Sequence, residues 1–254
     1  MGEKPKDYDL SGIGKFVHSD SAKRGLPIEP LTEEVKREIT VKDGLVEGVE
    51  DAVRIVRIGE ERKEGNMFYA PATITSISDG DERVIVDAGC IGEEVHLKKV
   101  LKNMEIPPED ITNVLITHNH PDHYGCAGIF KRAIVTLPDS RLRVSKPNKF
   151  AVMNSGIYGE PGKMVRSGFS DKIVLISTPG HAGWDFSVMY RGKNSRVLMC
   201  GDLFWSTEDW INDTEFLELC LIPNTQRRSR DYVRETLKPD IIVPGHGPAF
   251  APQY

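Results

Sequence analysis

Cysteine is scarce in this chain, and the few cysteines stand far apart. There are four, at Cys90, Cys126, Cys200 and Cys220, and no two have Cys-x-x-Cys spacing. A structural zinc knuckle needs such pairs, and a disulfide framework needs a denser set in a shorter chain. We therefore expect reduced, buried thiols, and we exclude a cysteine-based zinc knuckle and a disulfide scaffold.

Long hydrophobic runs and a strong charge of either sign are also missing. No run approaches the roughly 20 apolar residues of a transmembrane helix, and no signal-peptide core follows the first residues. The formal net charge is only −5, which does not favour nonspecific binding to nucleic acid or membranes. These absences predict a cytoplasmic protein without a membrane partner, and they favour a small-molecule substrate over RNA.

The chain is long enough for one large layered domain. It has 254 residues, of which 39% are hydrophobic and 28% charged, and a chain of this size can bury a single large core. Residues 1–50 are polar and interrupted by glycine and proline, so we expect an N-terminal extension there, which leaves a homodimer open. From residue 51 the sequence changes to strand-like runs.

Apolar runs predict the strands. A short helix capped by Thr32 is expected at 31–38, and helical spacing predicts three more helices. One helix spans Leu97 to Met104 and ends before Pro107, and the others are expected at 122–131 and 225–238. We interpret 138–170, rich in glycine and proline, as a substrate loop or lid. The arginines of the last helix are expected to face solvent: Arg227, Arg228, Arg230 and Arg234. The expected strands are 53–58, 71–78, 83–86, 114–116, 133–137, 172–176, 186–190, 196–200 and 241–243.

The densest chemical signal lies at residues 117–123, directly after the apolar run 114–116. Three histidines and one aspartate follow the pattern His-x-His-x-Asp-His in this stretch. Neutral imidazole nitrogens and a carboxylate are ligands that suit a d-block metal ion. A strand that ends here would deliver them to the edge of a sheet, so the stretch predicts a metal site.

Four further apolar runs end in an aspartate or a histidine beside glycine or proline, at Asp87, His181, Asp202 and His246. Functional side chains are commonly held on loops at one edge of a sheet, so we expect these ends to converge. Asp87 is expected to orient a ligand or a loop amide. The ligand count suffices for two ions and an open position for water. The candidate metal ligands are His118, His120, Asp122, His123, His181, Asp202 and His246.

The motifs at Asp87, 118–123, His181, Asp202 and His246 follow one another along the chain as in the metallo-β-lactamase-fold superfamily. The resemblance covers about residues 50–250. The resemblance implies an α/β fold, a four-layer αββα sandwich of two mixed β-sheets flanked by helices, with the catalytic domain at 51–254. Residues 178–187 and 243–250 also resemble the small metallo-β-lactamase-domain-containing protein 1 group. The resemblance further implies that one metal ion binds His118, His120 and His181, that the second binds Asp122, His123 and His246, and that Asp202 bridges them.

The expected function is hydrolysis of an ester, lactone, thioester or related bond. Two divalent metal ions, zinc first and iron or manganese as alternatives, would lower the pKa of a bridging water, and the hydroxide would attack the substrate. Asp122 is expected to pass a proton to the leaving group. Tyr124 either helps as a donor or packs, and the aromatic residues at 204, 205 and 210 either wall the pocket or fill the core.

Differences from other members of the superfamily narrow the range of reactions expected for this chain. Nothing follows Tyr254, so the helical substrate domain of glyoxalase II is not expected, and the long insertion of the cleavage-factor nucleases is missing. His123 stands where class B1 and B2 β-lactamases lack histidine, so antibiotic hydrolysis is not the first expectation. Two other reactions stay open on the same fold: a phosphodiesterase or ribonuclease, and a mononuclear iron oxidoreductase of the persulfide dioxygenase kind. A metal-stabilised scaffold is the non-enzymatic alternative.

Overall fold

The computed structural model describes residues 41–42, 45–46, 52–64, 67–146, 149–193, 195–213 and 216–254. The N-terminal extension predicted for 1–50 lies outside these ranges except for two short strands, β1 (Val41–Lys42) and β2 (Leu45–Val46). In the part of the chain that is described, no helix has the length and apolar character needed to cross a bilayer.

Nine strands form the larger sheet, in the order β1-β2-β3-β6-β7-β8-β9-β10-β11. Strand β8 is parallel to both neighbours, β7 and β9, and the other pairs are antiparallel. Parallel neighbours need a crossover connection, and α1 (Glu94–Asn103) and α2 (Pro121–Tyr124) lie in the two crossovers. The remaining bounds are β3 (Val53–Arg57), β6 (Ile74–Asp79), β7 (Glu82–Val86), β8 (Asn113–Leu115), β9 (Ile134–Thr136), β10 (Ser140–Lys146) and β11 (Lys149–Asn154).

Five strands form the smaller sheet, in the order β12-β13-β14-β15-β16. Only β15 and β16 are parallel in this sheet, and the helices α3 (Thr207–Ile211) and α4 (Pro223–Asp231) lie in the crossover between them, with the π-helix η7 (Tyr232–Leu237) continuing α4. A separate hairpin pairs β4 (Arg62–Glu64) with β5 (Met67–Tyr69). The strands are β12 (Met164–Arg166), β13 (Ile173–Ser177), β14 (Phe186–Arg191), β15 (Arg196–Gly201) and β16 (Ile241–Pro244), and single 3₁₀ turns are η4 (Pro108–Asp110), η5 (Ala127–Ile129) and η6 (Leu217–Leu219).

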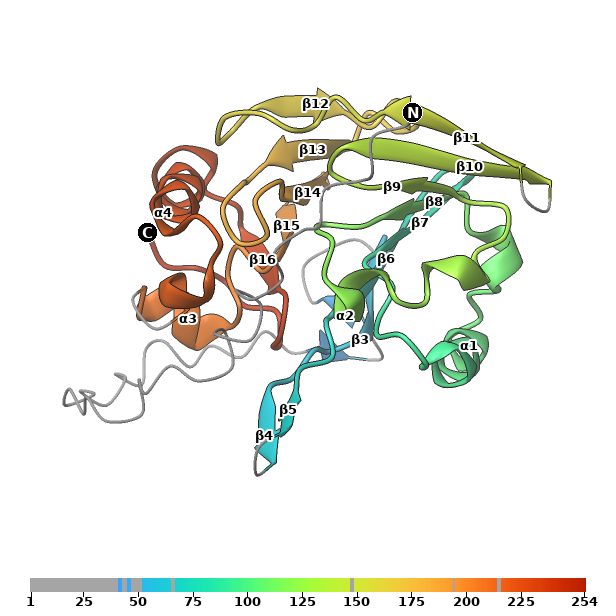
Figure 1. Ribbon diagram of the computed structural model, residues 1–254, viewed down its shortest axis with the longest axis horizontal. Helices are drawn as coiled ribbons and strands as arrows, with labels where there is room; N and C mark the ends of the chain where they lie inside the picture. Colours follow the sequence, from blue (N-terminus) through green and yellow to red (C-terminus); the bar gives the residue numbers. More distant parts are fainter. Residues whose placement is uncertain are drawn as a thin grey trace, which may run out of the picture. The chain divides into compact units, whose positions relative to one another are not determined.

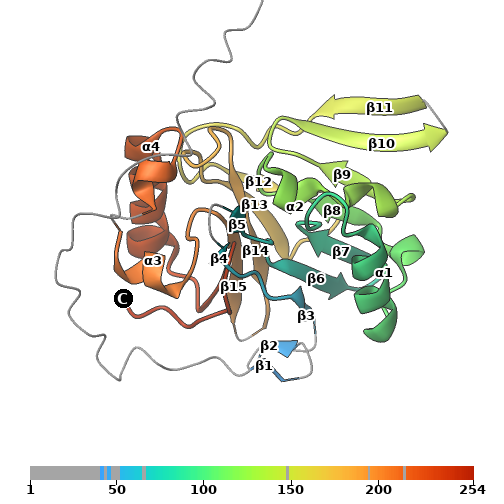
Figure 2. The same ribbon diagram turned by 60° about the horizontal axis from the view of Figure 1, so that its bottom comes forward.

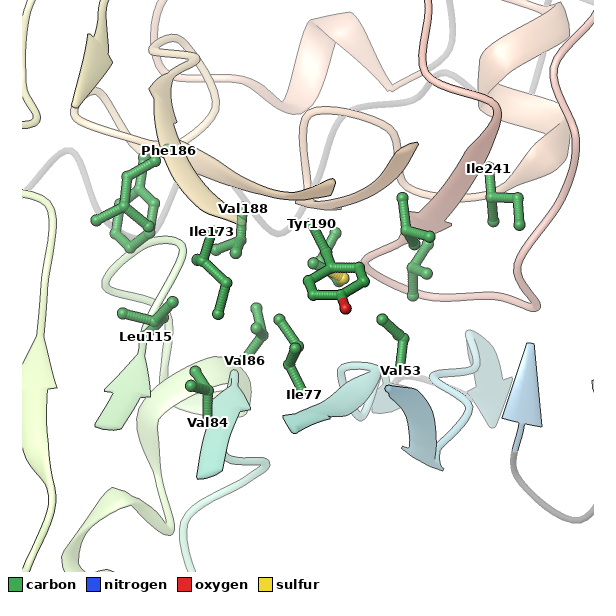
Figure 3. Packing of buried hydrophobic residues seen from close by; sticks show 14 of the residues in the cluster. Val53, Ile77, Val84, Val86, Leu115, Ile173, Phe186, Val188, Tyr190 and Ile241 are labelled. Carbon is green, nitrogen blue, oxygen red and sulfur yellow. The ribbon is translucent and has the colours of Figure 1, made fainter. Parts of the chain in front are cut away.

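The two sheets face each other, with α1 and α2 outside the larger sheet and α3 and α4 outside the smaller one (Figures 1 and 2). Side chains alternate across a strand, so Val84 and Val86 of β7 join the core between the sheets (Figure 3), whereas Ile85 joins the layer beneath α1. In β15, Met199 faces the core between the sheets and Leu198 faces the helical layer. Strands buried on both faces appear in the sequence as continuous apolar runs. The two facing sheets with helices outside them confirm the predicted αββα sandwich.

The helix predicted around Leu97 is confirmed as α1, but the one predicted at 122–131 is too long. Helix α2 ends at Tyr124, and a single 3₁₀ turn follows at 127–129. Gly125 follows the last residue of α2 and still has helical dihedral angles, and a Cβ there would collide with the backbone of Cys90 and Ile91. The chain turns where it touches the neighbouring loop and does not continue as a helix.

The predicted loop or lid at 138–170 is wrong over about half of its length, where the chain forms strands. Strands β10 and β11 form a hairpin that extends the larger sheet beyond β9 (Figure 2), and β12 adds the edge of the smaller sheet. Polar and apolar residues alternate in 140–146 as in a strand, but the glycines and prolines of the segment favoured a loop in the prediction. Among the described residues, 137–139, 155–163 and 167–172 connect strands as loops.

The expectation that all four arginines of the last helix face solvent is also wrong. Arg227 and Arg228 are exposed, but Arg230 is fully buried. Its Nη2 lies 2.6 Å from Oδ2 of Asp209 and its Nη1 2.7 Å from Oδ1 of Asp213. Because a buried charge is tolerated only when it is paired, these carboxylates make the burial of Arg230 favourable.

Arg230→Leu should destabilise the fold by roughly 3–5 kcal/mol, since it leaves the buried carboxylate of Asp209 unpaired. The matched control is Arg227→Leu on the exposed side of the same helix, expected within about 0.5 kcal/mol of the unchanged chain. Urea unfolding followed by circular dichroism measures both. A loss below about 1 kcal/mol for Arg230→Leu would contradict the buried ion pair.

Asp79 links the end of β6 to the loop before β13, and it should make part of the stability pH-dependent. A hydrogen bond from Ser170 and the ammonium of Lys172 hold the pKa of Asp79 below its ordinary value. A lowered folded-state pKa contributes stability above the unfolded pKa of about 3.9, and that stability is lost as the pH falls through the folded pKa. Asp79→Asn should therefore cost about 1–2 kcal/mol at pH 7 and little at pH 2.5, whereas Asp81→Asn, in the exposed turn, should not show this difference.

Candidate metal centre

All seven candidate ligands meet at the ends of strands from both sheets. The motif at 118–123 follows β8 and forms the start of α2. His181 follows β13, Asp202 follows β15, and His246 follows β16. His118, His123, His181, Asp202 and His246 are buried, and His120 and Asp122 are partly exposed. The structure thus brings together every residue that the sequence placed at the site.

Three imidazole nitrogens form the first group of potential ligands. Nδ1 of His120 lies 3.0 Å from Nε2 of His118 and 3.0 Å from Nε2 of His181. Oδ2 of Asp202 completes this group, 3.2 Å from Nε2 of His181 and 3.7 Å from Nε2 of His118. His120 therefore presents Nδ1 to the group, whereas the other two histidines present Nε2.

The second group lies on the other side of Asp202. Oδ1 of Asp202 is 3.2 Å from Nε2 of His123 and 3.4 Å from Nε2 of His246. Oδ2 of Asp122 lies 3.3 Å and 3.5 Å from the same two nitrogens. The two oxygens of Asp202 thus face different groups, which is the arrangement expected of a carboxylate between two cations.

Neighbouring groups orient the histidines so that a nitrogen of each faces inward. Nδ1 of His123 lies 2.8 Å from Oδ2 of Asp87, and Nδ1 of His246 lies 3.3 Å from the carbonyl oxygen of Pro71. When these Nδ1 atoms donate, the Nε2 lone pairs remain available for a metal ion. Nδ1 of His118 lies near the hydroxyl of Thr117, and Nδ1 of His181 is 3.9 Å from Sγ of Cys220.

Asp87 holds the end of β8 as well as His123. Its Oδ1 accepts hydrogen bonds from the backbone N–H of Thr117 at 2.8 Å and from the Thr117 hydroxyl at 3.1 Å. The backbone of Asp87 has φ +57°, a left-handed conformation that a non-glycine residue adopts at a cost and that often occurs at functional sites. This geometry turns the carboxylate from the strand end towards the motif.

Helix α4 holds the His181 loop and the Asp202 loop in place together. The amide of Gln226 donates to the carbonyl oxygens of Asp202 (2.9 Å) and Leu203 (3.0 Å), and Nε of Arg230 donates to Leu203 at 2.9 Å. The hydroxyl of Ser229 donates to the carbonyl of Pro179 at 2.7 Å. Gln226, Ser229 and Arg230 are fully buried, so these bonds are shielded from water.

Glycine provides the space that this close packing needs. A Cβ on Gly245 would overlap Oδ1 of Asp202, and a Cβ on Gly180 would overlap the backbone of Gln226. The glycines that flank His181 and His246 in the sequence are therefore required by close approach of neighbouring atoms.

The buried polar atoms of the site fit a bound cation. Nε2 of His123, Nε2 of His246 and Oδ1 of Asp202 make no hydrogen bond to any residue of the described ranges, although buried polar atoms normally have a partner. Burial would raise the pKa of Asp202, but the surrounding imidazoles hold it well below its ordinary value. Burial and the neighbouring histidines hold the pKa of His118 well below its ordinary value, which keeps it neutral. Converging lone pairs and ionised carboxylates are the donor set of a divalent metal ion.

The other residues considered from the sequence divide between the site and the core. Phe204 is fully buried, and Trp210 packs against the same helical layer. The indole of Trp205 instead stacks on the ring of His246, with centroids 4.3 Å apart. Tyr124 is 38% exposed, and neither role proposed for it is tested by its position.

Several residues that shape the site were missed by the sequence analysis. Asp185 is buried and accepts hydrogen bonds from the N–H groups of Gly180 and Ala182; burial raises its pKa to about 6. Gln226 and Arg230 were missed although a signal existed. Arg230 and Gln226 precede the apolar Val233 by three and seven residues, so helical spacing places all three on one face of the helix, which is buried.

Asp87→Asn should weaken metal binding without disturbing the backbone. Asparagine tolerates the left-handed conformation, but it lacks the charge that favours Nδ1 protonation of His123, and loss of such a partner typically costs about 10–100-fold in affinity. Competition with a zinc chelator measures the change. Asp110→Asn, an exposed position, is the control, and a zinc affinity within about twofold of the unchanged chain for Asp87→Asn would contradict the assigned role.

Comparison with known proteins agrees with this architecture. One similar structure is that of a Thermotoga maritima protein named as a candidate metallo-β-lactamase. It superposes on this chain with a TM-score of 0.55 at 20% sequence identity, and the match covers 79% of this chain and 99% of that one. A mutant B. thuringiensis protein with N-decanoyl-L-homoserine bound at its active site matches with a TM-score of 0.56 at 16% identity, covering 78% and 93%. Both likenesses concern the fold alone.

The sequence comparisons identify the family. Residues 71–138 match the model of the metallo-β-lactamase superfamily. Metallo-β-lactamase domain-containing protein 1 of Xenopus laevis is 31% identical over 187 residues, which cover 73% of this chain and 75% of that protein. The human protein of the same name is 33% identical over 174 residues, covering 66% and 59%. Together with the strand-end histidines and aspartates, these matches show that the chain belongs to the metallo-β-lactamase superfamily.

Proposed function

We propose that this chain is a two-metal hydrolase that cleaves an ester, lactone, thioester or related bond. The superfamily consists generally of metal-dependent hydrolases, and the chain has a candidate His/Asp metal site. The observation that carries the proposal is the position of Asp202, whose two oxygens face separate groups of potential ligands at 3.2–3.7 Å and 3.2–3.4 Å. Zinc is the first candidate metal, with iron and manganese as alternatives.

The residues would divide the work of the site among them. Two divalent ions held there would supply a water of near-neutral pKa and a positive charge that polarises the bond under attack. One ion would be held by His118, His120 and His181. The other would be held by Asp122, His123 and His246, and Asp202 would bind both ions. Because 21% of the Asp122 side chain is exposed, its carboxylate contacts both the buried ligands and the solvent side, where it would pass a proton to the leaving group.

The proposal also includes a small-molecule substrate. One structure with this fold, titled an N-acyl homoserine lactone hydrolase, has its product N-hexanoyl-L-homoserine bound at the catalytic metal centre. At 16% identity this likeness carries the fold alone, so lactones enter the experiment as one class among several. Phosphodiesters and persulfides test the two rival reactions.

Removal of the ligands should abolish both metal binding and turnover. We expect about two metal ions per chain in the unchanged protein, fewer in His118→Ala and Asp202→Ala, and a fall in kcat/KM of at least about 100-fold, since even loss of a group behind a ligand costs up to that much. Elemental analysis gives the stoichiometry, and lactones, thioesters, esters, phosphodiesters and a persulfide give the activity.

His96→Ala is the matched control, because His96 is exposed on α1. Hydrolysis that survives in metal-free Asp202→Ala would refute the proposal. Turnover restricted to phosphodiesters would favour the nuclease reading. One iron per chain with oxygen consumption on the persulfide would favour the oxidoreductase.

A further inference from the structure

Three large apolar side chains stand exposed on the loops beside His181. Tyr158, Trp184 and Leu221 are 38%, 57% and 61% exposed, and we call them the apolar rim. Single exposed apolar residues are common, but a group of them next to a functional site marks a surface that binds something.

The rim is a connected surface although its residues are far apart in the sequence. The rings of Tyr158 and Trp184 meet edge to face, with centroids 5.2 Å apart. A methyl group of Leu221 lies over Gly183, within van der Waals reach of the position that a Cβ would occupy there. Gly183 precedes Trp184 in the chain, so Leu221 lies beside the backbone that carries Trp184, and the Trp184 ring contacts Tyr158.

Backbone hydrogen bonds connect the rim to His181. The N–H of Leu221 donates to the carbonyl of His181 at 2.8 Å, and the N–H of Ile222 donates to Gly180 at 2.9 Å. Asp185 holds the other side of this loop through the N–H groups of Gly180 and Ala182. The rim is therefore held at a constant position relative to a candidate metal ligand, which a binding surface for part of a substrate requires.

A second apolar surface lies beside His181 and His246. The indole of Trp205 stacks on Phe216 with centroids 5.4 Å apart and an interplanar angle of 18°. The same indole stacks on His246 and lies edge-on to His181, 6.0 Å away. The metal centre thus has an aromatic wall at His246 and the rim at His181.

Few charges accompany these apolar surfaces. Apart from His181, residues 154–159, 180–184 and 219–222 include no ionisable side chain except Tyr158 and Cys220. Lys163 donates to the carbonyl of Tyr158, and Arg228 lies 3.2 Å from Glu160. A polyanionic strand would need a row of unpaired basic groups, whereas an uncharged hydrocarbon gains by covering the rim.

We propose that the apolar rim of Tyr158, Trp184 and Leu221 binds the hydrocarbon part of the substrate, so that the chain acts on acyl compounds with a medium-length apolar chain. This rests on the proposed function, because the carbonyl to be attacked would lie at the metal centre while its alkyl chain covers the rim. The carboxylate product of such a reaction would bind in the same way.

The test combines turnover with a binding measurement that needs no turnover. The zinc-loaded full chain is given p-nitrophenyl esters from butanoate to decanoate, and calorimetry measures binding of the corresponding alkanoate anions. Each added methylene should raise kcat/KM and affinity about threefold to fourfold, since burial of one methylene is worth about 0.8 kcal/mol, until the rim is covered.

Trp184→Ala and Leu221→Ser should reduce the ratio between octanoate and butanoate affinity by about tenfold and leave butanoate binding within about twofold. Val95→Ser is the control, because Val95 is 83% exposed on α1. Unchanged chain-length dependence in both rim variants would overturn the proposal. A dimer that becomes a monomer in both variants, with no dependence on chain length in the unchanged protein, would identify the rim as a subunit interface and also overturn it.

The two proposals fail in different ways. If alkanoates bind with the expected dependence on chain length but no ester, lactone or thioester is cleaved, the proposed reaction is wrong and the rim assignment stands. If esters are cleaved at rates independent of chain length, the proposed reaction stands and the rim assignment is wrong.

Discussion

The fold of this chain has to accommodate the buried carboxylate of Asp202, which lies between its two sheets. An ionised group that is only 3% exposed is strongly unfavourable unless cations or hydrogen-bond donors surround it. Four histidines surround it, from the ends of β8, β13 and β16, and cations held among them would supply that environment. Because these strands belong to different sheets, the sheets must hold their relative position for the carboxylate to be tolerated.

The helical layer behind the smaller sheet serves this requirement. Helix α4 places a buried amide and a buried guanidinium on the carbonyl groups of Asp202 and Leu203, and a hydroxyl on Pro179. Arg230 is kept charged in the interior by Asp209 and Asp213. The positions of the candidate ligands therefore depend on a second group of paired charges, which lies in the helical layer behind the smaller sheet.

Much of this arrangement was predictable because its signals are local. The His-x-His-x-Asp-His motif and the apolar runs that end at His181, Asp202 and His246 carry both the ligand chemistry and the strand positions. The close approach of Gly125, just past the end of α2, to a loop 35 residues earlier was not predictable, because it depends on tertiary packing. The β10–β11 hairpin was not predicted, because the glycines and prolines of 138–170 favoured a loop. The burial of Arg230 depends on carboxylates that lie 17 and 21 residues away in the chain.

Gly245 places Asp202 by having no side chain, since any Cβ would occupy the position of Oδ1. On the loops beside His181, in contrast, the side chains of Trp184 and Leu221 are 57% and 61% exposed. Mutational tolerance should therefore differ sharply over a short distance. Under the proposed function, the reaction depends on positions such as Gly245, where no side-chain atom can be added. Under the rim proposal, substrate preference can change through substitutions of exposed residues that leave the metal ligands in place.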